Sequence, residues 1–506
     1  MNTPVEPRLD RPVFFISLGT LIVVTGLLLL DPEANLVRLG KAKEFMTHDI
    51  GLLFLIFVFG GILWLAWMAL SKHGKIRFGP PGEPAAYSMF SWMGMLFCCG
   101  IGSNLLYFGT TEWVGYFLSP PPISGAVARS AEAADWAGAY SFFHWGISAW
   151  ATYAMATLPI AYMLHVRKSP TLRISTACEG LIGERSKGKL GKLIDVFFIF
   201  GLVGGVGTSL GIGIPMISAV ASDIFGISRG LALDAAILVG LTALFSASVA
   251  AGLDKGIKLL SDINMGLATV LLCFFLIVGP TAFILTQAFE SLGLMLSNFV
   301  EMSLRTDQDI SSTFAQDYTI FFWAWWLSWA PFMGLFIARI SRGRTVREVV
   351  WGVVIGGSVG CWAGFAILGN ATLNLVNNGH VVLNTMIDSG TVDAPMVVVE
   401  LLKAQPFSMV VSIGFFVLAF IFVATSLDSA AFTLAATASD ELPAEGQPAR
   451  WHRLTWAFIL AITALSLMLV GGLEVLQAAS VVVGLPVLFI LGMMITGLMR
   501  QIKADS

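Results

Sequence analysis

The sequence predicts an all-α polytopic membrane protein, because it is far more apolar than a soluble chain of this length. Hydrophobic residues make up 56% of the 506 residues and charged residues 12%, whereas soluble proteins carry about 25% charged residues. Apolar stretches long enough to cross about 30 Å of hydrocarbon predict twelve transmembrane helices in one domain. They fall near residues 13–30, 50–70, 88–118, 137–165, 192–222, 230–252, 260–288, 318–340, 346–373, 406–438, 453–473 and 475–499.

The loop charges predict that both termini are cytoplasmic. Cytoplasmic loops carry the excess of Lys and Arg. With both ends inside, seven of the 29 basic residues lie in outer loops, which leaves 22 for the inner loops and tails. The connection from Arg167 to Lys192 holds seven of those 22. This asymmetry agrees with an even number of spans.

The remaining composition excludes several other classes. The net charge of −3 comes without a basic patch, so no nucleic-acid partner is expected. The five cysteines have no metal-ligand spacing and are expected to be small buried hydrophobic residues. The first apolar run is too long for a signal peptide and lacks a small-residue cleavage site after Leu30, so it is expected to stay in the mature protein.

The third span contains glycines that are expected to interrupt its helix. Gly100, Gly102 and Gly109 lie in the stretch MLFCCGIGSNLLYFGTTEW, and each weakens a helix by roughly 1 kcal/mol relative to alanine. Non-helical backbone is tolerated in a membrane where it is buried or lines a cavity. Close helix packing through small residues is the alternative, and this segment alone supports both equally.

The tenth span carries hydroxyl and carboxyl groups at mid-depth. Thr425, Ser426, Asp428 and Ser429 lie within one turn, and paired hydroxyls beside open backbone carbonyls suit a hard cation such as Na⁺. Hydrogen bonds from the hydroxyls to their own helix are the alternative. Carboxylates inside a membrane are functional candidates, yet Asp428 serves equally well as a packing group, and Glu112 lies near an outer end where water can reach it.

Aromatic residues occupy the middle of the fourth and eighth spans. The segments FFHWGISAWATYA and FFWAWWLSWAPF place indole rings at mid-depth, whereas tryptophan normally gathers at the membrane interface. A desolvated quaternary ammonium gains roughly 0.5 to 2 kcal/mol from each aromatic face that it meets. On a continuous helix, Trp145, Tyr153 and Trp150 would fall at about 0°, 80° and 140°. The pattern therefore predicts a carrier of a methylated onium compound, with a plain core stripe as the alternative.

From the third span onward, the chain resembles the betaine/carnitine/choline transporter (BCCT) family, and in particular its sodium-coupled glycine betaine and carnitine carriers. The resemblance rests on GIGSNLLYFGTTE, FHWGISAWATYA, WAWWLSWAPF and FIARISRGRTVREV, in this order. It implies the inverted-repeat architecture of the leucine transporter, with helices 3–7 and 8–12 as the repeats. A single transporter domain, residues 1–506, would then hold two peripheral N-terminal helices (1–87), a first repeat (88–288) and a second repeat (318–499).

The family resemblance also implies where the substrate binds. The aromatic box of the family matches Trp145, Trp150, Tyr153 and Trp326, and a second aromatic contact on the cytoplasmic route matches Trp329. The same comparison adds further positions to the expected substrate site: Trp325, Gly102, Ser103, Asn104 and Met333.

Sodium is the coupling ion that the resemblance implies, and no other cofactor is expected. In coupled members, the ion near the substrate is held by positions that match Cys98, Ile101 and Phe422 through carbonyls, and Thr425 and Ser426 through side chains. Sodium-independent exchangers carry an arginine where this chain has Asn264, which favours sodium symport. Exchange of substrate for product without sodium is the alternative.

Three departures from the family narrow the expected substrate. Choline carriers tend to have aspartate at the position of Asn104, so a neutral amide favours zwitterions such as betaines, carnitine or dimethylsulfoniopropionate. Met333 matches exchangers, and Thr208 and Ser209 supply too few hydroxyls for a second ion, so one sodium is expected. The resemblance further implies a homotrimer in the bacterial inner membrane.

Two other classes of function are disfavoured. A channel needs polar rings along a continuous pore, whereas the hydroxyls and charges gather at two spans. An intramembrane enzyme needs a nucleophile with a base or metal ligands, and the six histidines form no such pattern. His144 is the central one and is expected to be a packing residue.

Overall fold

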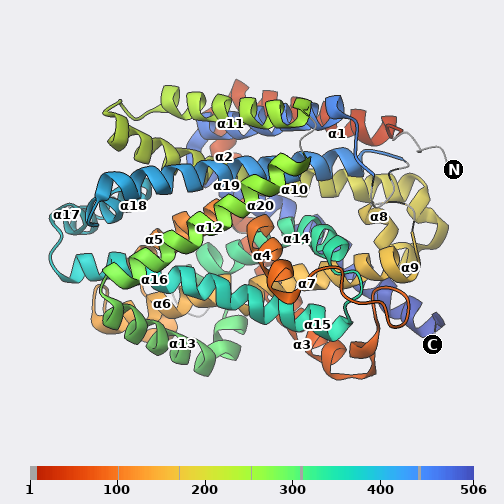
Figure 1. The fold of residues 1–506 in the computed structure, drawn as a ribbon, viewed down its shortest axis with the longest axis horizontal. Helices are drawn as coiled ribbons and strands as arrows, with labels where there is room; N and C mark the ends of the chain where they lie inside the picture. Colours follow the sequence, from red (N-terminus) through yellow and green to blue (C-terminus); the bar gives the residue numbers. More distant parts are fainter. Residues whose placement is uncertain are drawn as a thin grey trace.

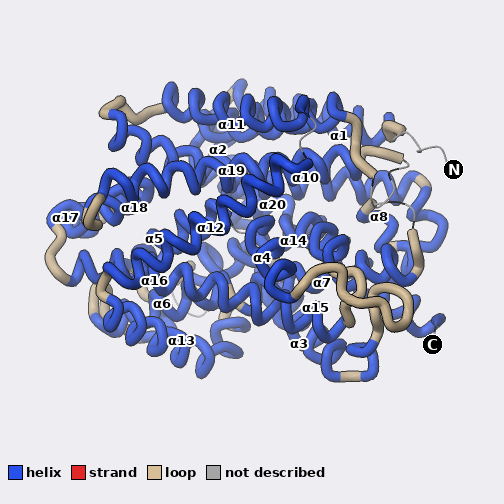
Figure 2. The backbone as a smooth tube through the Cα atoms, in the orientation of Figure 1, coloured by secondary structure: helices blue, strands red, loops and turns tan. Residues whose placement is uncertain are grey.

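The protein is built from helices packed side by side. The computed structural model describes residues 8–505 except 101, 170, 172, 252–253, 308–311, 441 and 443–445, and leaves out the side chains at 98–100, 248, 250–251, 254–262, 471–474 and 476. Every regular element in the described part of the chain is a helix, as Figure 2 shows. The predicted all-α polytopic class is confirmed.

Twenty α-helices, with short 3-10 and π turns between some of them, follow one another along the described chain. The first ten are α1 (Arg11–Leu30), α2 (Pro32–Glu44), α3 (Gly51–Leu70), α4 (Met89–Gly100), α5 (Gly102–Leu118), α6 (Ala131–Trp145), α7 (Ile147–Ala161), α8 (Ile174–Ala177), α9 (Glu179–Ile182) and α10 (Lys189–Phe225). The other ten are α11 (Leu231–Ala251), α12 (Asp254–Val278), α13 (Thr281–Leu304), α14 (Phe321–Ile340), α15 (Val346–Trp351), α16 (Gly357–Asn377), α17 (Val381–Ser389), α18 (Ala394–Lys403), α19 (Ser408–Thr437) and α20 (Arg450–Asp505).

Ten stretches of the described chain are long and apolar enough to cross a membrane, and the bent pair α4 and α5 makes an eleventh. Two shorter apolar stretches lie in α11 and α12. The predicted twelve spans correspond to this set if α11 and α12 are counted and α13 is not. The number twelve, and the division into a peripheral pair and two repeats, stay predictions.

The seventh predicted span, residues 260–288, is wrong at its C-terminal end. The helix α12 stops at Val278, and α13 begins at Thr281. Pro280 has no backbone N–H to continue the helix, and the Thr281 hydroxyl instead donates to the Leu276 carbonyl at 2.6 Å. The apolar run continues through this break, so apolarity alone joined two helices.

The last element, α20, contains two membrane-length stretches, Arg450–Val470 and Gln477–Asp505. A straight helix of its 56 residues would be about 84 Å long. Both of its ends nevertheless lie near the connection between α7 and α10. At one end, the Trp451 ring contacts Phe14 at the start of α1, which an ion pair between Asp10 and Arg173 joins to that connection. At the other end, Asp505 pairs with Arg167 at 2.8 Å. The chain therefore turns back within α20, in agreement with the two spans predicted there.

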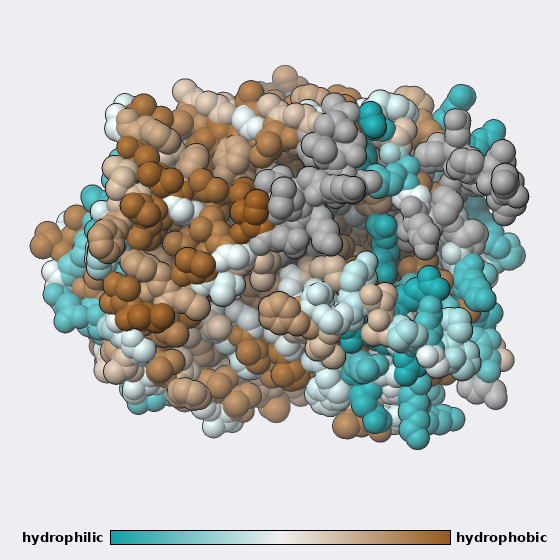
Figure 3. All heavy atoms as spheres, viewed as in Figure 1, coloured by the Kyte–Doolittle hydropathy of each residue, from teal (hydrophilic) through white to brown (hydrophobic). Residues whose placement is uncertain are grey.

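Surface polarity agrees with a membrane crossing along the long axis of Figure 1. In Figure 3, apolar side chains cover much of the broad flank, while hydrophilic residues gather mainly at the end that holds both termini in Figure 1. Having both termini at one end agrees with an even number of crossings.

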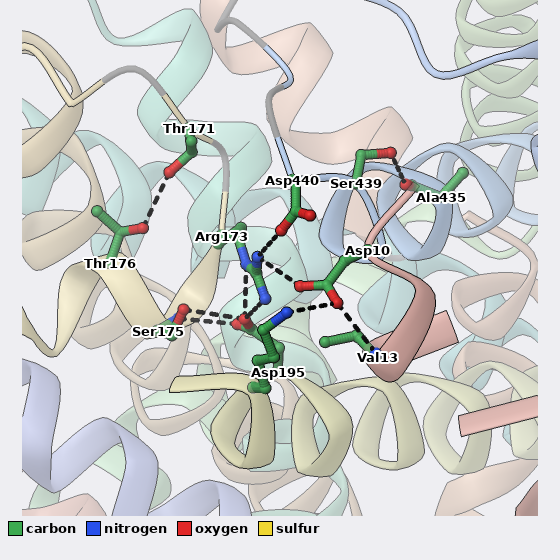
Figure 4. A network of polar contacts seen from close by, with 11 residues as sticks. Asp10, Val13, Thr171, Arg173, Ser175, Thr176, Asp195, Ala435, Ser439 and Asp440 are labelled. Carbon is green, nitrogen blue, oxygen red and sulfur yellow. Dashed lines mark hydrogen bonds and ion pairs between the residues drawn. The ribbon is translucent and has the colours of Figure 1, made fainter. Parts of the chain in front are cut away.

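An ionic cluster, buried at Asp10 and Asp195, ties four segments together at the end that holds the start of α1 and the end of α20 (Figure 4). The Arg173 guanidinium, just before α8, lies 2.8 Å from Asp10, 2.7 Å from Asp195 and 3.1 Å from Asp440. Lys192 approaches Asp10 at 2.9 Å. Burial raises the pKa of Asp10, but the hydrogen bonds from Lys192 and the Val13 amide outweigh this and hold the pKa below its ordinary value. The cluster thus joins the start of α1 to α10 and to the end of α19.

Candidate functional site

The fourth predicted span is broken at Gly146, next to the first aromatic residue of the expected box. Gly146 has φ −100° and ψ −131°, so α6 ends at Trp145 and α7 begins at Ile147. A Cβ at this position would lie 2.5 Å from both the Phe142 carbonyl and the Trp362 indole nitrogen. The arc calculated for a continuous helix is therefore wrong, because Trp145 lies on a different helix from Trp150 and Tyr153.

The break at Gly146 leaves two backbone carbonyls without helical partners, and tryptophans from other helices donate hydrogen bonds to them. Trp362 of α16 donates its indole N–H to Phe142 at 2.8 Å, and Trp326 of α14 donates to His144 at 2.9 Å. Buried carbonyls that lack a helical partner need another donor. The broken backbone of α6 and α7 therefore fixes the orientation of the Trp326 ring.

The four residues of the expected box form one buried aromatic cluster. Each is at most 1% exposed. The ring centroids of Trp145 and Trp326 are 4.7 Å apart at 81°, those of Tyr153 and Trp326 6.1 Å apart at 89°, and those of Trp150 and Tyr153 5.6 Å apart at 82°. Each ring therefore stands nearly perpendicular to its neighbour in this series.

The three tryptophans of the box all have bonded indole N–H groups. Trp145 donates to Glu112, Trp150 donates to the Cys361 sulfur at 3.4 Å, and Trp326 donates to the backbone. Hydrogen bonds at the edge fix the plane of each ring. The electron-rich faces are the part that these side chains offer to a ligand.

Glu112 anchors a buried hydrogen-bond network on the side of the box that lies nearer the C-terminal end of α5, called the outer side below. Its side chain is 4% exposed and accepts from Tyr116 at 2.5 Å and from the Trp145 indole. The Tyr116 hydroxyl lies 2.6 Å from His144 Nδ1, and His144 Nε2 lies 3.0 Å from the Thr319 hydroxyl. The sequence suggested a hydrated Glu112 and a packing His144. Both belong to one network that holds a box tryptophan.

A cavity of about 1070 Å³ reaches the outer side of this network. It lies between α2, α5, α14 and α20, and Phe108, Glu112 and Phe322 are among its lining residues. The Phe108 and Phe322 rings lie 5.2 and 5.9 Å from the Trp145 ring. These two phenylalanines therefore separate the cavity from the box.

Two other tryptophans of α14 have unpaired indole N–H groups. Trp325 and Trp329 are 0% and 3% exposed, and neither Nε1 has a hydrogen-bond partner within the described structure. They lie four residues apart on one face of the helix. Trp325 stacks on Trp326 at 5.1 Å and 20°, so this pair adjoins the box.

Asn104 of α5 places an unpaired acceptor beside the same region. It is 5% exposed, and its amide nitrogen donates to Ser209 of α10 at 3.0 Å. Its Oδ1 has no partner among the residues that the structure describes. Gly205, one turn away on α10, faces Trp329, because a Cβ there would lie 2.9 Å from Trp329 Nε1.

The expected sodium residues are brought together in part. Gly102, with φ +26°, lies against Phe422, since a Cβ would be 3.1 Å from that ring. Thr425 donates to the Ile421 and Phe422 carbonyls at 3.0 Å each, within a continuous α19. This is the local bonding that the sequence left as the alternative for a hydroxyl. Ser426 is half-buried. The side chain of Cys98 and the whole of Ile101 lie outside the part of the chain that the structure describes.

The remaining candidates have structural neighbours. Asp428 pairs with Arg453 of α20 at 2.7 Å, which supports a packing role for this carboxylate. Met333 is fully buried on α14, and Ser103 lies beside Gly213 of α10. Thr208 bonds to Ser480 at 2.6 Å.

Sequence reasoning missed the role of Glu112 and the partner of Trp150, which is Cys361. Glu112 carried a signal, since it follows Asn104 and Phe108 at intervals of four on one helix face. Cys361 carried none, because it lies 211 residues from Trp150.

The fold and this site define a class: an all-α polytopic membrane protein with a mid-membrane aromatic cluster beside broken helices. Such interruptions near the bilayer midplane are typical of the binding sites of secondary transporters.

Comparison with known proteins identifies the family. The sequence profile described as "BCCT, betaine/carnitine/choline family transporter" matches residues 12–506. The chain is 35% identical to the ectoine/hydroxyectoine transporter of Virgibacillus pantothenticus over 98% of this chain and 97% of that one. It is 34% identical to the glycine betaine transporter OpuD of Bacillus subtilis, over 97% and 93%, and 33% identical to the glycine betaine transporter of Acinetobacter baylyi, over 99% and 74%. The chain belongs to the betaine/carnitine/choline transporter family.

Proposed function

We propose that this protein is a secondary active transporter that imports a zwitterionic quaternary ammonium or sulfonium compound by symport with one Na⁺. Family membership and relatives named as glycine betaine and ectoine transporters support a betaine-type substrate. The proposal places the protein in the bacterial inner membrane as a homotrimer, with both termini in the cytoplasm.

The observation that carries the proposal is the series of perpendicular rings Trp150, Tyr153 and Trp326. Centroids 5.6 and 6.1 Å apart at 82° and 89° allow neighbouring faces to lie within about 6 Å of one cation. A trimethylammonium or dimethylsulfonium group has no hydrogen to donate, so aromatic faces are the groups that recognise it. Rings whose N–H groups are already bonded suit this task.

Sodium coupling is supported by the placement of Gly102 against Phe422, beside the Thr425 and Ser426 hydroxyls. Opening the Thr425 hydrogen bonds would release its hydroxyl and the Phe422 carbonyl for a hard cation. If a neutral zwitterion enters with one Na⁺, each cycle moves one charge inward. A membrane potential of 100 mV then contributes about 2.3 kcal/mol, or roughly fifty-fold accumulation.

Uptake of radiolabelled glycine betaine and ectoine into proteoliposomes tests the proposal. An inward sodium gradient should drive electrogenic accumulation, and potassium on both sides should not. The double variant Thr425→Ala with Ser426→Ala should lose accumulation while it keeps exchange down the substrate's own gradient. Equal uptake in the two ionic conditions, with strong stimulation by internal substrate, would instead identify the sodium-independent exchanger.

A further inference from the structure

The indole N–H groups around the box fall into two sets. In the box, Trp145, Trp150 and Trp326 have acceptors and present only their faces. On the adjoining stripe of α14, Trp325 and Trp329 have buried N–H groups without an acceptor among the described residues. Buried donors are normally paired, and a persistent exception needs an explanation. Two unpaired donors one turn apart on one helix face are candidates to donate to an anionic group of a ligand.

The third unpaired atom is an acceptor, Asn104 Oδ1. Its orientation is set by neighbouring hydrogen bonds. The Ser209 hydroxyl has one proton and donates it to the Gly205 carbonyl at 3.3 Å, so Ser209 accepts from Asn104 at 3.0 Å through the amide nitrogen. The amide oxygen is therefore the free end of Asn104.

Asn104 and the two tryptophans border the same region. Asn104 lies one turn from Phe108 on one face of α5, and the Phe108 ring contacts Trp325 at 5.6 Å. Along α10, Ser209 contacts Asn104 and Gly205 faces Trp329. Four residues of helix separate these two contacts by about 6 Å, a length that a molecule the size of an amino acid can bridge.

We infer that Trp325, Trp329 and Asn104 form a polar subsite that selects zwitterions carrying a hydrogen-bond donor in addition to the carboxylate. The two indoles bind the carboxylate, and Asn104 Oδ1 accepts from an N–H or O–H group of the substrate. A fully methylated betaine has no donor for Asn104 and leaves this acceptor unpaired. Unpaired buried groups are what give a site its strongest discrimination between analogues.

This inference rests on the proposed function and narrows its substrate. Within the proposed class, carnitine carries a hydroxyl group in addition to its carboxylate, whereas glycine betaine carries no hydrogen-bond donor. Recognition by Asn104 would therefore favour the carnitine type.

Two matched pairs of competitors test the subsite with the purified wild-type protein. N,N-dimethylglycine differs from glycine betaine by an N–H in place of a methyl group, and carnitine differs from γ-butyrobetaine by one hydroxyl. In at least one pair, the member with the donor should bind about tenfold more tightly, which corresponds to about 1.4 kcal/mol. The pair that shows the preference identifies whether the donor is N–H or O–H.

The variant Asn104→Leu should abolish that preference, so that the two members of the pair bind with equal affinity, whereas Asn104→Asp, which keeps an acceptor, should retain it. Equal affinities within both pairs in the wild type would overturn the inference. If glycine betaine still bound in that case, the proposed function would remain intact. If the wild type bound none of these compounds, the proposed function itself would fall.

Discussion

The outer and inner sides of the aromatic box differ in how their polar groups are satisfied. On the outer side, Glu112 and His144 are hydrogen-bonded to box residues and to each other through Tyr116. On the inner side, meaning Trp325 and Trp329 of α14 together with Asn104, one polar atom of each residue has no partner among the described residues, at a burial similar to that of Glu112. A fully hydrogen-bonded network makes its surroundings rigid, whereas buried polar groups without a partner can form hydrogen bonds to a ligand. We therefore expect a structural role for the first group and ligand recognition for the second.

The largest expected effect lies on the outer side. Replacing Glu112 by Leu leaves the Trp145 indole without an acceptor and removes one hydrogen bond of Tyr116, whose hydroxyl keeps His144 as a partner. The free energy of unfolding should therefore fall by about 1.5 to 4.5 kcal/mol. Glu112→Gln keeps one acceptor and should cost about half as much. Thermal unfolding in detergent measures both.

The matched control on the inner side is Asn104→Leu. It removes the hydrogen bond to Ser209, whose hydroxyl keeps its bond to Gly205, so the cost should be about 0.5 to 1.5 kcal/mol. An equal loss of stability from Glu112→Leu and Asn104→Leu would remove the distinction between the two sides.

The next effect concerns the ring faces. Trp326→Leu and Trp150→Leu keep apolar bulk and remove the quadrupole, so each should weaken binding of an onium substrate by at least about 1 kcal/mol. Phenylalanine should be milder, because it retains a face. Unchanged affinity in folded Leu variants would assign these rings to packing alone.

Much of this site follows from the sequence, and the rest depends on contacts between distant residues. The mid-depth aromatics in FFHWGISAWATYA and FFWAWWLSWAPF indicated an aromatic site, the family resemblance selected its four residues, and apolarity predicted the fold class. The structure shows those four residues in one buried cluster, and their role in binding stays a prediction. The break at Gly146 was not predicted, because helical periodicity assumes a continuous helix and glycine is compatible with both a continuous and an interrupted one. The role of Glu112 escaped because its partner Trp145 lies 33 residues further along the chain, on α6, which the periodicity of α5 cannot reveal.

A smaller effect on stability is expected when tryptophans of the two sets are each replaced by phenylalanine. Trp326→Phe leaves the His144 carbonyl without its donor and should destabilise the protein by about 1 kcal/mol more than Trp325→Phe or Trp329→Phe, which break no hydrogen bond. The latter two should instead weaken binding of carboxylate-bearing substrates. All three changes remove the same atoms from buried rings, so packing losses largely cancel. Comparable unfolding temperatures for the three variants would mean that the His144 bond contributes nothing.

The smallest expected effect concerns charge selection at Asn104. Because this amide carries no formal charge, a substrate without its own carboxylate lacks a counter-charge there, and the wild type should transport betaines far better than choline. Asn104→Asp should narrow this gap, and competition between radiolabelled choline and glycine betaine measures it. Glu112 is another carboxyl group next to the box, because its side chain is hydrogen-bonded to Trp145 on the outer side. If the wild type carried choline as well as any betaine, the counter-charge would have to come from Glu112. Asn104 would then bind polar groups of the substrate without determining whether the protein prefers zwitterions or cations.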